Sequence, residues 1–301
     1  MIKKILPWAM VWTLALHGQR DIRLLGPQEP PLFPQLSPRA SVQQVIGTTV
    51  LSVTYHRPKV RGRAIWGSLV PYGQVWRTGA NEATTISFSE PVKVQGHPVP
   101  AGTYALFSIP GPDQWTLILN KRAKQIGAWE YDPKLDLVRF DVKAKPVLHT
   151  EWLTYEVYPG NAYTAYVDLY WEKIRVSFLV EVDVDEIVTK RMRKLMASRP
   201  NDWKIFAQAA EYCLEQEIHM GEALAWAERS IKIQEDPTNL FVKARLLHHA
   251  GKVSEAIQMA EKAIQMAKNR KASAAVLGPM EVTLAQWKKG GVKPPSSQRP
   301  K

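Results

Sequence analysis

The chain has 301 residues, and its apolar fraction of 45% and charged fraction of 23% are those of a globular protein, which excludes wholesale disorder. Its net charge of +12 is spread as +2, +4 and +6 over residues 1–38, 39–182 and 183–301, with acidic residues interleaved throughout. Nucleic-acid-binding proteins concentrate positive charge on a stripe or a tail, so we expect no nucleic-acid partner. The length predicts two domains.

The first residues have the pattern of a secretory signal peptide. Lys3 and Lys4 precede an uncharged, mostly apolar run from Ile5 to Leu16. That run is shorter than the roughly 20 residues that span a bilayer, and it has the length of a signal-peptide core. We predict a signal peptide over residues 1–18, with cleavage after Ala15 as one alternative and a buried N-terminal helix as another. The mature protein is then expected to be exported, periplasmic or secreted, soluble and without a membrane anchor.

A proline-rich linker and an all-β domain are predicted next. Residues 19–38 contain five prolines, which favour extended spacer conformations. Apolar and polar residues then alternate, which is typical of strands. The expected strands cover residues 49–55, 84–88, 92–94, 104–109, 115–119, 137–142, 152–157, 163–171 and 174–182, with a hairpin around Gly96. Such short strands without intervening amphipathic helices predict a β-sandwich or barrel over residues 39–182.

Helical periodicity begins at Asp183. The expected helices cover residues 184–198, 203–215, 221–233, 239–250, 254–266 and 275–288. Residues 221–233 align with 254–266 at a spacing of 33, with five identical positions. This spacing resembles tetratricopeptide repeats, so we predict a tetratricopeptide-like domain over residues 183–290 that docks a protein partner, followed by a disordered tail over 291–301. The single cysteine, Cys213, is expected to be a small buried side chain.

Residues 57–84 lack the alternation of apolar and polar residues that is typical of strands. A connection of this length inside a compact β domain is typical of a functional loop, and its aromatic residues argue against disorder. Arginine forks recognise carboxylate or phosphate, and aromatic faces stack on rings or cations. We therefore predict a site for a glycan, a peptidoglycan fragment or another anionic small ligand. The candidate ligand-binding residues are Tyr55, Arg57, Arg63, Trp66, Tyr72, Trp76, Arg77, Asn81 and Glu82.

Three motifs in this domain closely resemble a bacterial family known as domain of unknown function 2911. They are YxRPxxxGRxIWGxLVPYGxVWRTGANEAT from residue 55, PAGTYALFSIPG from residue 100 and WTLILN from residue 115. The resemblance covers residues 36–182 approximately and implies a shared domain without implying an activity. One departure is Ile126, which precedes Gly127 where family members tend to have a tryptophan, while Trp129 lies nearby. If that tryptophan lines a site, the site is altered here.

Common catalytic and metal-binding patterns are absent from the sequence. There is no GxSxG elbow, no Walker loop and no HExxH. His56, His97 and His149 lie on different predicted β elements without a metal-ligand spacing, so we predict no metal and no cofactor. Glu82 is the candidate catalytic acid–base residue, and the sequence leaves open whether the chain is an enzyme.

Three hypotheses about function therefore remain open. In the first, the chain is a binding and interaction protein that uses the loop for a ligand and the helical repeat for a partner. In the second, it hydrolyses an envelope glycan or peptidoglycan, with Glu82 as the acid–base group. In the third, the β domain is purely structural: Arg77 and Glu82 pair with each other, and Tyr55, Trp66 and Trp76 plug one end of the sandwich.

Overall fold

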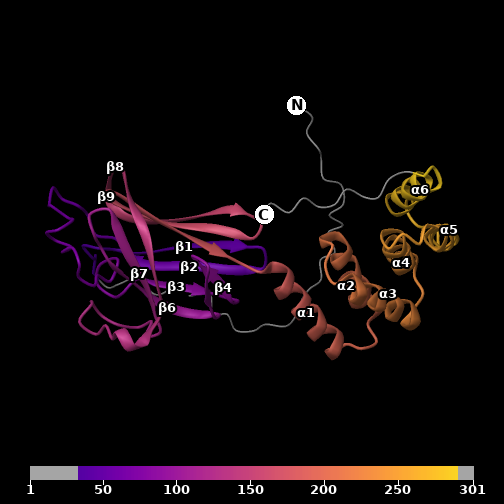
Figure 1. The fold of residues 1–301 in the computed structure, drawn as a ribbon, viewed down its shortest axis with the longest axis horizontal. Helices are drawn as coiled ribbons and strands as arrows, with labels where there is room; N and C mark the ends of the chain where they lie inside the picture. The colour runs from indigo at the N-terminus through magenta and orange to yellow at the C-terminus, as the bar shows by residue number, and fades with distance from the viewer. Residues whose placement is uncertain (1–32, 291–301) are drawn as a thin grey trace. The chain divides into compact units, whose positions relative to one another are not determined.

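The computed structural model describes residues 33–290. The predicted signal peptide (1–18), most of the predicted linker (19–38) and the predicted tail (291–301) lie outside the described residues. The chain divides into two compact units, one ending at Glu181 and the other beginning at Val182, one residue from the predicted boundary. Figure 1 draws the strands of the first unit and the helices of the second.

The first unit consists of strands, as predicted. Within the described residues nine antiparallel strands form one continuous order, β1-β2-β3-β6-β7-β8-β9-β4-β5. Their bounds are β1 (Arg39–Ile46), β2 (Thr49–His56), β3 (Thr85–Phe88), β4 (Val92–Val94), β5 (His97–Val99), β6 (Gly102–Ile109), β7 (Gln114–Asn120), β8 (Asp136–Asn161) and β9 (Thr164–Glu181), with a short 3-10 helix at Pro133–Leu135. The prediction of an all-β domain followed by an all-α domain is confirmed.

Two strands are longer than the sequence predicts. β8 has 26 residues and β9 has 18, where four shorter strands were expected. The pairing register between them shifts after Pro146 and again after Thr150, and Glu172 opposite Thr150 adopts a φ of 55°. Irregularities of this kind are bulges, which bend a strand without ending it. The turn-forming residues therefore interrupt the alternation of apolar and polar residues in the sequence, but they do not end β8 or β9.

Strand β8 connects the two parts of the strand order. Its residues 136–143 pair with β7, and its residues 144–161 pair with β9. The core contains large side chains from both parts, including Trp115 on β7 and Trp171 on β9. On β2, buried Leu51 and Val53 flank the half-buried Ser52, which is the alternation that the sequence shows.

The second unit consists of helices that begin close to the predicted positions. The bounds within the described chain are α1 (Val184–Ser198), α2 (Trp203–Gln216), α3 (Met220–Ile233), α4 (Pro237–His249), α5 (Val253–Asn269) and α6 (Ala274–Lys288). Asp183, Asp202 and Asp236 are N-cap residues whose carboxylates accept backbone N–H groups in the first turn. Such caps satisfy donors that have no partner inside the helix, which explains why these helices begin where they do.

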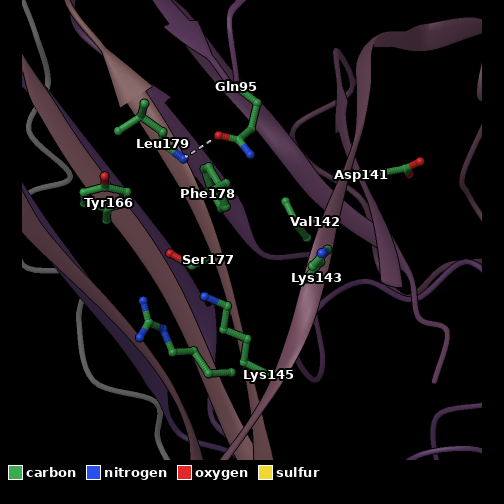
Figure 2. Close-up of a pocket in the computed structure, with 10 residues that line it drawn as sticks. Gln95, Asp141, Val142, Lys143, Lys145, Tyr166, Ser177, Phe178 and Leu179 are labelled. Atoms are coloured by element: carbon green, nitrogen blue, oxygen red, sulfur yellow. Dashed lines mark hydrogen bonds between the residues drawn. The ribbon is translucent and has the colours of Figure 1, made fainter. Parts of the chain in front are cut away.

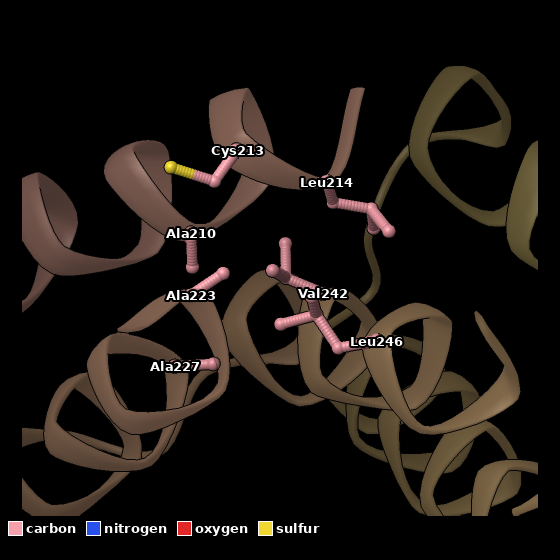
Figure 3. Packing of buried hydrophobic residues seen from close by; sticks show 7 residues of the cluster. All are labelled: Ala210, Cys213, Leu214, Ala223, Ala227, Val242 and Leu246. Carbon is pink, nitrogen blue, oxygen red and sulfur yellow. The ribbon is translucent and has the colours of Figure 1, made fainter. Parts of the chain in front are cut away.

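Small side chains let the helices of this unit approach closely. Ala210 on α2 packs with Ala223 and Ala227 on α3, in a cluster that also contains Cys213 and residues of α4 (Figure 3). Cys213 is 1% exposed, and burial raises the pKa of its thiol to about 11, so it is a buried apolar side chain rather than a reactive one. Among residues 33–290, no helix has the length and apolar content needed to cross a membrane.

Candidate functional site

Two tryptophans in the first part of the predicted functional loop pack against tryptophans of the strands. Trp66 and Trp76 from the loop meet Trp115 and Trp171 from the strands. Trp76 stacks on Trp171 with ring centroids 5.8 Å apart and an interplanar angle of 17°, and its Nε1 donates to the carbonyl of Gly79 at 3.2 Å. Buried aromatic groups of this size stabilise a core strongly. These two loop tryptophans therefore help to hold the domain together, Trp76 as a buried ring and Trp66 as a half-buried one.

Two of the predicted arginines donate hydrogen bonds inside the domain. Arg57 Nε donates to the carbonyl of Leu153 at 3.0 Å, and its Nη2 donates to Thr154 Oγ1 at 2.7 Å. Arg63 Nε donates to the carbonyl of Val60 at 3.0 Å, and its Nη2 donates to the carbonyl of Lys59. Arg57 thus ties the start of the loop to β8, and Arg63 closes the loop on itself.

The two predicted tyrosines also have internal roles. Tyr55 is buried on β2 and meets Tyr155 edge-on at 4.8 Å. Tyr72 is partly exposed, and its ring lies over Gly67, where an added Cβ would come within 2.9 Å of Tyr72 Cε2. Gly67 also has a φ of 77°, so the tight turn and the ring packing both require glycine there.

The second part of the loop, residues 77–82, forms a strained turn that we call the 77–82 turn. Thr78 and Asn81 both have a φ of 55°, a conformation that is rare for residues other than glycine and costly for a β-branched one. The hydroxyl groups of Thr84 and Tyr155 donate to the carbonyl of Thr78 at 2.9 and 3.2 Å, which holds the turn in place. Backbone strain of this kind is concentrated at ligand-binding and catalytic sites.

A charged cluster lies on this turn. His56 Nε2, at the end of β2, is 3.2 Å from Glu82 Oε2, and the Glu82 side chain is 62% exposed. Burial lowers the pKa of His56, Glu82 opposes that effect, and the positive charges of Arg39 and Arg77 add to it. Glu82 and Arg77 therefore both lie close enough to His56 to act on it electrostatically.

Arg77 differs from the other arginines of the loop. Its Nε is buried and has no hydrogen-bond partner, and within the described residues it forms no ion pair. Burial lowers the pKa of its guanidinium, and no nearby carboxylate offsets that effect. The expected Arg77–Glu82 ion pair is absent, because Glu82 pairs with His56 instead.

A neighbouring loop, residues 125–130, completes the surface and was not included in the predicted site. The N–H of Ala83 donates to the carbonyl of Gln125 at 3.0 Å, and the backbones of Glu82 and Ile126 form an isolated antiparallel β-bridge. Ile126 is 57% exposed and Trp129 is 78% exposed. The Trp129 ring lies over Gly127, so its other face is open to solvent. In the sequence, the departure from the family pattern at Ile126 is the feature that indicates the 125–130 loop as part of a site.

Asn81 belongs to this surface, whereas His97 and His149 lie on other strands. Asn81 lies in the 77–82 turn, where its Nδ2 donates to the carbonyl of Ser37 at 3.3 Å. His149 pairs with Glu151 on β8, and His97 is exposed on β5. In the part of the chain that the structure describes, no group of three or more histidine, cysteine, aspartate or glutamate side chains is placed to hold a metal ion.

Comparison with known proteins supports the domain assignment and adds no activity to it. No curated protein and no solved structure matches the chain. A family model does match the β domain, over almost the range that the three sequence motifs indicate. The predicted resemblance is therefore confirmed, and residues 37–180 match the family described as protein of unknown function DUF2911.

Proposed function

We propose that the chain is an exported binding protein whose β domain holds a polar, ring-bearing ligand with an anionic group, such as a peptidoglycan fragment. The proposed site consists of the 77–82 turn and the 125–130 loop. Trp129 offers an open aromatic face, Asn81 and Glu82 offer hydrogen-bonding groups, and Arg77 offers a cation. An apolar ring face beside a few fixed polar groups is the usual composition of a small-molecule site.

The unpartnered guanidinium of Arg77 is the observation that carries this proposal. Burying a cation without a partner costs free energy, and within the described chain Arg77 has no carboxylate to offset that cost. Arg57 and Arg63, by contrast, have partners inside the domain. An anionic group on a ligand would supply the missing partner through charge-assisted hydrogen bonds.

Calorimetric titration with soluble muropeptides tests the proposed site. We expect saturable binding that weakens about tenfold in Trp129→Ala, because a truncated aromatic anchor commonly costs more than 1 kcal/mol. Arg77→Met should weaken binding of muropeptides and leave binding of neutral chito-oligosaccharides unchanged. The control is Leu148→Ala, which removes an exposed apolar side chain outside the proposed site, on β8. Equal affinities for all variants, or no binding, would refute the site.

Hydrolysis of the same polymers is a second candidate function, favoured by the contact between Glu82 and His56. A carboxylate beside a histidine is a common arrangement for proton transfer. Release of reducing ends from peptidoglycan, compared between the unmodified chain and Glu82→Gln, tests this function. Unchanged release in a folded Glu82→Gln variant would eliminate Glu82 as the acid–base residue.

We also propose that the helical unit docks a protein partner, and the contacts between its helices support this. α2 contacts both α3 and α4, and α4 contacts α5. In tetratricopeptide repeats the first helices of successive units contact each other in this way and form one binding surface for a protein partner. A pull-down from periplasmic extract with residues 184–290 that recovers nothing above background would count against docking.

Export is the remaining part of the proposal, and it depends on the signal-peptide pattern of residues 1–18. N-terminal sequencing of the protein recovered from a periplasmic fraction tests it. A first residue directly after position 15 or 18 would support cleavage, and an intact N-terminus in the cytoplasmic fraction would refute it.

A further inference from the structure

Strand β8 changes partner along its length, and this change opens a cleft beside β9. Pairing with β7 ends at Lys143, and pairing with β9 begins at Ala144, opposite Val176. Beyond that point β9 pairs with β4 through Val180 and Glu181, so β8 and β9 diverge. The cleft between them has a volume of about 400 Å³ and is shown in Figure 2. That size falls within the range of small-molecule sites.

Three cations line this cleft. Lys145 lies directly opposite Arg175 across the strand pair, and Lys143 lies two residues earlier on the same face of β8. Like charges at facing positions destabilise a sheet. Neither lysine forms an ion pair with any carboxylate of the described chain, and the lining carboxylate Asp141 accepts hydrogen bonds from Gln114 and Thr116. The two lysines therefore have no ion-pair partner within the described chain, and Asp141 is the one carboxylate in the lining that faces them.

Arg175 is held in a fixed orientation at the cleft. Its Nε lies 2.7 Å from Oδ2 of Asp168, a carboxylate that is fully buried, and its Nη2 donates to the Tyr158 hydroxyl at 3.2 Å. Tyr170 donates to the same Asp168 oxygen at 2.9 Å, which fixes the carboxylate in turn. A guanidinium held on one side by such partners keeps its remaining N–H groups for a second anion.

The cleft also has groups suited to the organic part of a ligand. Phe178 and Val142 are buried and line part of the cleft, and Ser177 on β9 lines it as well. Tyr166, at the rim, stacks with Tyr158 at 5.5 Å and stays partly exposed. Cations and a hydroxyl beside apolar and aromatic surface match a phosphate attached to a small organic group.

We propose that the cleft between β8 and β9 binds a small phosphate-bearing molecule, with Lys143, Lys145 and Arg175 holding the phosphate. This site is separate from the proposed glycan site on the 77–82 turn, and neither depends on the other. The competing explanation is that lysines on an exposed strand only prevent association with other sheets. That explanation predicts no saturable binding of phosphate.

Calorimetric titration of the full chain with inorganic pyrophosphate tests the proposal, with citrate as a carboxylate probe of similar charge. We expect saturable binding of pyrophosphate, tighter than that of citrate. The double variant Lys143→Gln/Lys145→Gln should weaken pyrophosphate binding about tenfold or more, because it removes two cations and their charge-assisted hydrogen bonds to the phosphate. Arg175 is left unchanged, since removing it would leave buried Asp168 without its ion pair.

The control variant is Lys134→Gln, which removes one exposed lysine of the same unit that does not line the cleft. It should bind pyrophosphate as tightly as the unmodified chain. Equal weakening by Lys134→Gln would show general attraction to positive charge and would overturn the proposal. So would the absence of saturable binding, unchanged binding in the double variant, or citrate binding as tight as that of pyrophosphate.

Discussion

The two parts of the segment 57–84 differ in what their polar groups bind. In residues 57–76, Arg57 and Arg63 donate to backbone carbonyls, and Trp66 and Trp76 pack in the interior. In residues 77–84, Arg77 has no partner among the described residues, and Glu82 is exposed. The same residue types therefore stabilise the domain in one part and remain available for a ligand in the other. Arg77, which has no internal partner among the described residues, is therefore the strongest candidate for function in this segment.

The largest expected effect is in the first part, at Trp76. Trp76→Ala removes a buried ring that stacks on Trp171, and it should lower the free energy of unfolding by about 3–5 kcal/mol. Urea denaturation measures the change. Trp129→Ala is the control, because that side chain is exposed and should change stability by less than about 0.5 kcal/mol. Similar losses of unfolding free energy in both variants would contradict the assignment of Trp76 to the interior and of Trp129 to the surface.

Arg57 should have the next largest effect. Arg57→Met removes two hydrogen bonds that link the loop to Leu153 and Thr154, and it leaves a carbonyl without its donor. We expect a loss of about 1–3 kcal/mol in the free energy of unfolding. Arg61→Met removes the same charge from an exposed arginine whose side chain makes no hydrogen bond or ion pair within the described chain, so it should be nearly neutral. An equal loss in the two variants would show that charge, rather than hydrogen bonding, matters.

Arg77→Met should behave in the opposite way from Arg57→Met. It removes a cation that is partly buried without a partner, so we expect the free energy of unfolding to stay within about 1 kcal/mol of its original value or to rise. Thermal and urea unfolding of the two variants side by side measure the contrast. A loss of about 2 kcal/mol or more in Arg77→Met would mean that this arginine is structural too.

The smallest effect concerns the pH dependence of stability at His56. Burial lowers the pKa of His56 below its ordinary value of 6.5, and Glu82 partly offsets this. As the pH falls below about 6.5, the unfolded chain takes up a proton before the folded chain does, so stability decreases. His56→Gln should remove that contribution, which we expect to be less than about 1 kcal/mol.

Melting temperatures between pH 7.5 and pH 5 measure this difference. His248 is a second histidine whose pKa burial lowers, so the unmodified chain should lose stability from both, and His56→Gln should lack the part due to His56. His97→Gln, at an exposed position on β5, is the control. An identical pH dependence in the unmodified chain and in His56→Gln would refute this role of His56.

Much of the fold follows from local patterns. Helix α1 begins where the sequence predicts, because Asp183 caps its first turn, and it ends at Ser198 as predicted. The joining of predicted strands into β8 and β9 could not be foreseen, since bulges at Pro146 and Glu172 depend on the partner strand. The phosphate cleft was missed for the same reason. It exists only because β8 leaves β9 at Ala144, and no local pattern marks that position.

The structure divides the sequence candidates for the site into two groups. Asn81, Glu82 and Arg77 stay at the surface that we propose, whereas Arg57, Trp66 and Trp76 serve the interior. Arginine and tryptophan have the same chemistry in either role. Their positions in the sequence therefore could not separate ligand-binding residues from structural ones.

The sequence by itself determined the class of each unit, because side-chain periodicity and helix caps are properties of neighbouring residues. Only the tertiary structure decided which polar groups are left without partners. Arg57 finds its acceptor in Leu153, 96 residues away, and Trp76 finds its stacking partner in Trp171. Arg77 finds no such partner in the described chain. Hydrogen bonds and ring contacts form between residues that are close in space, so the groups that remain free for a ligand are known only once the chain has folded.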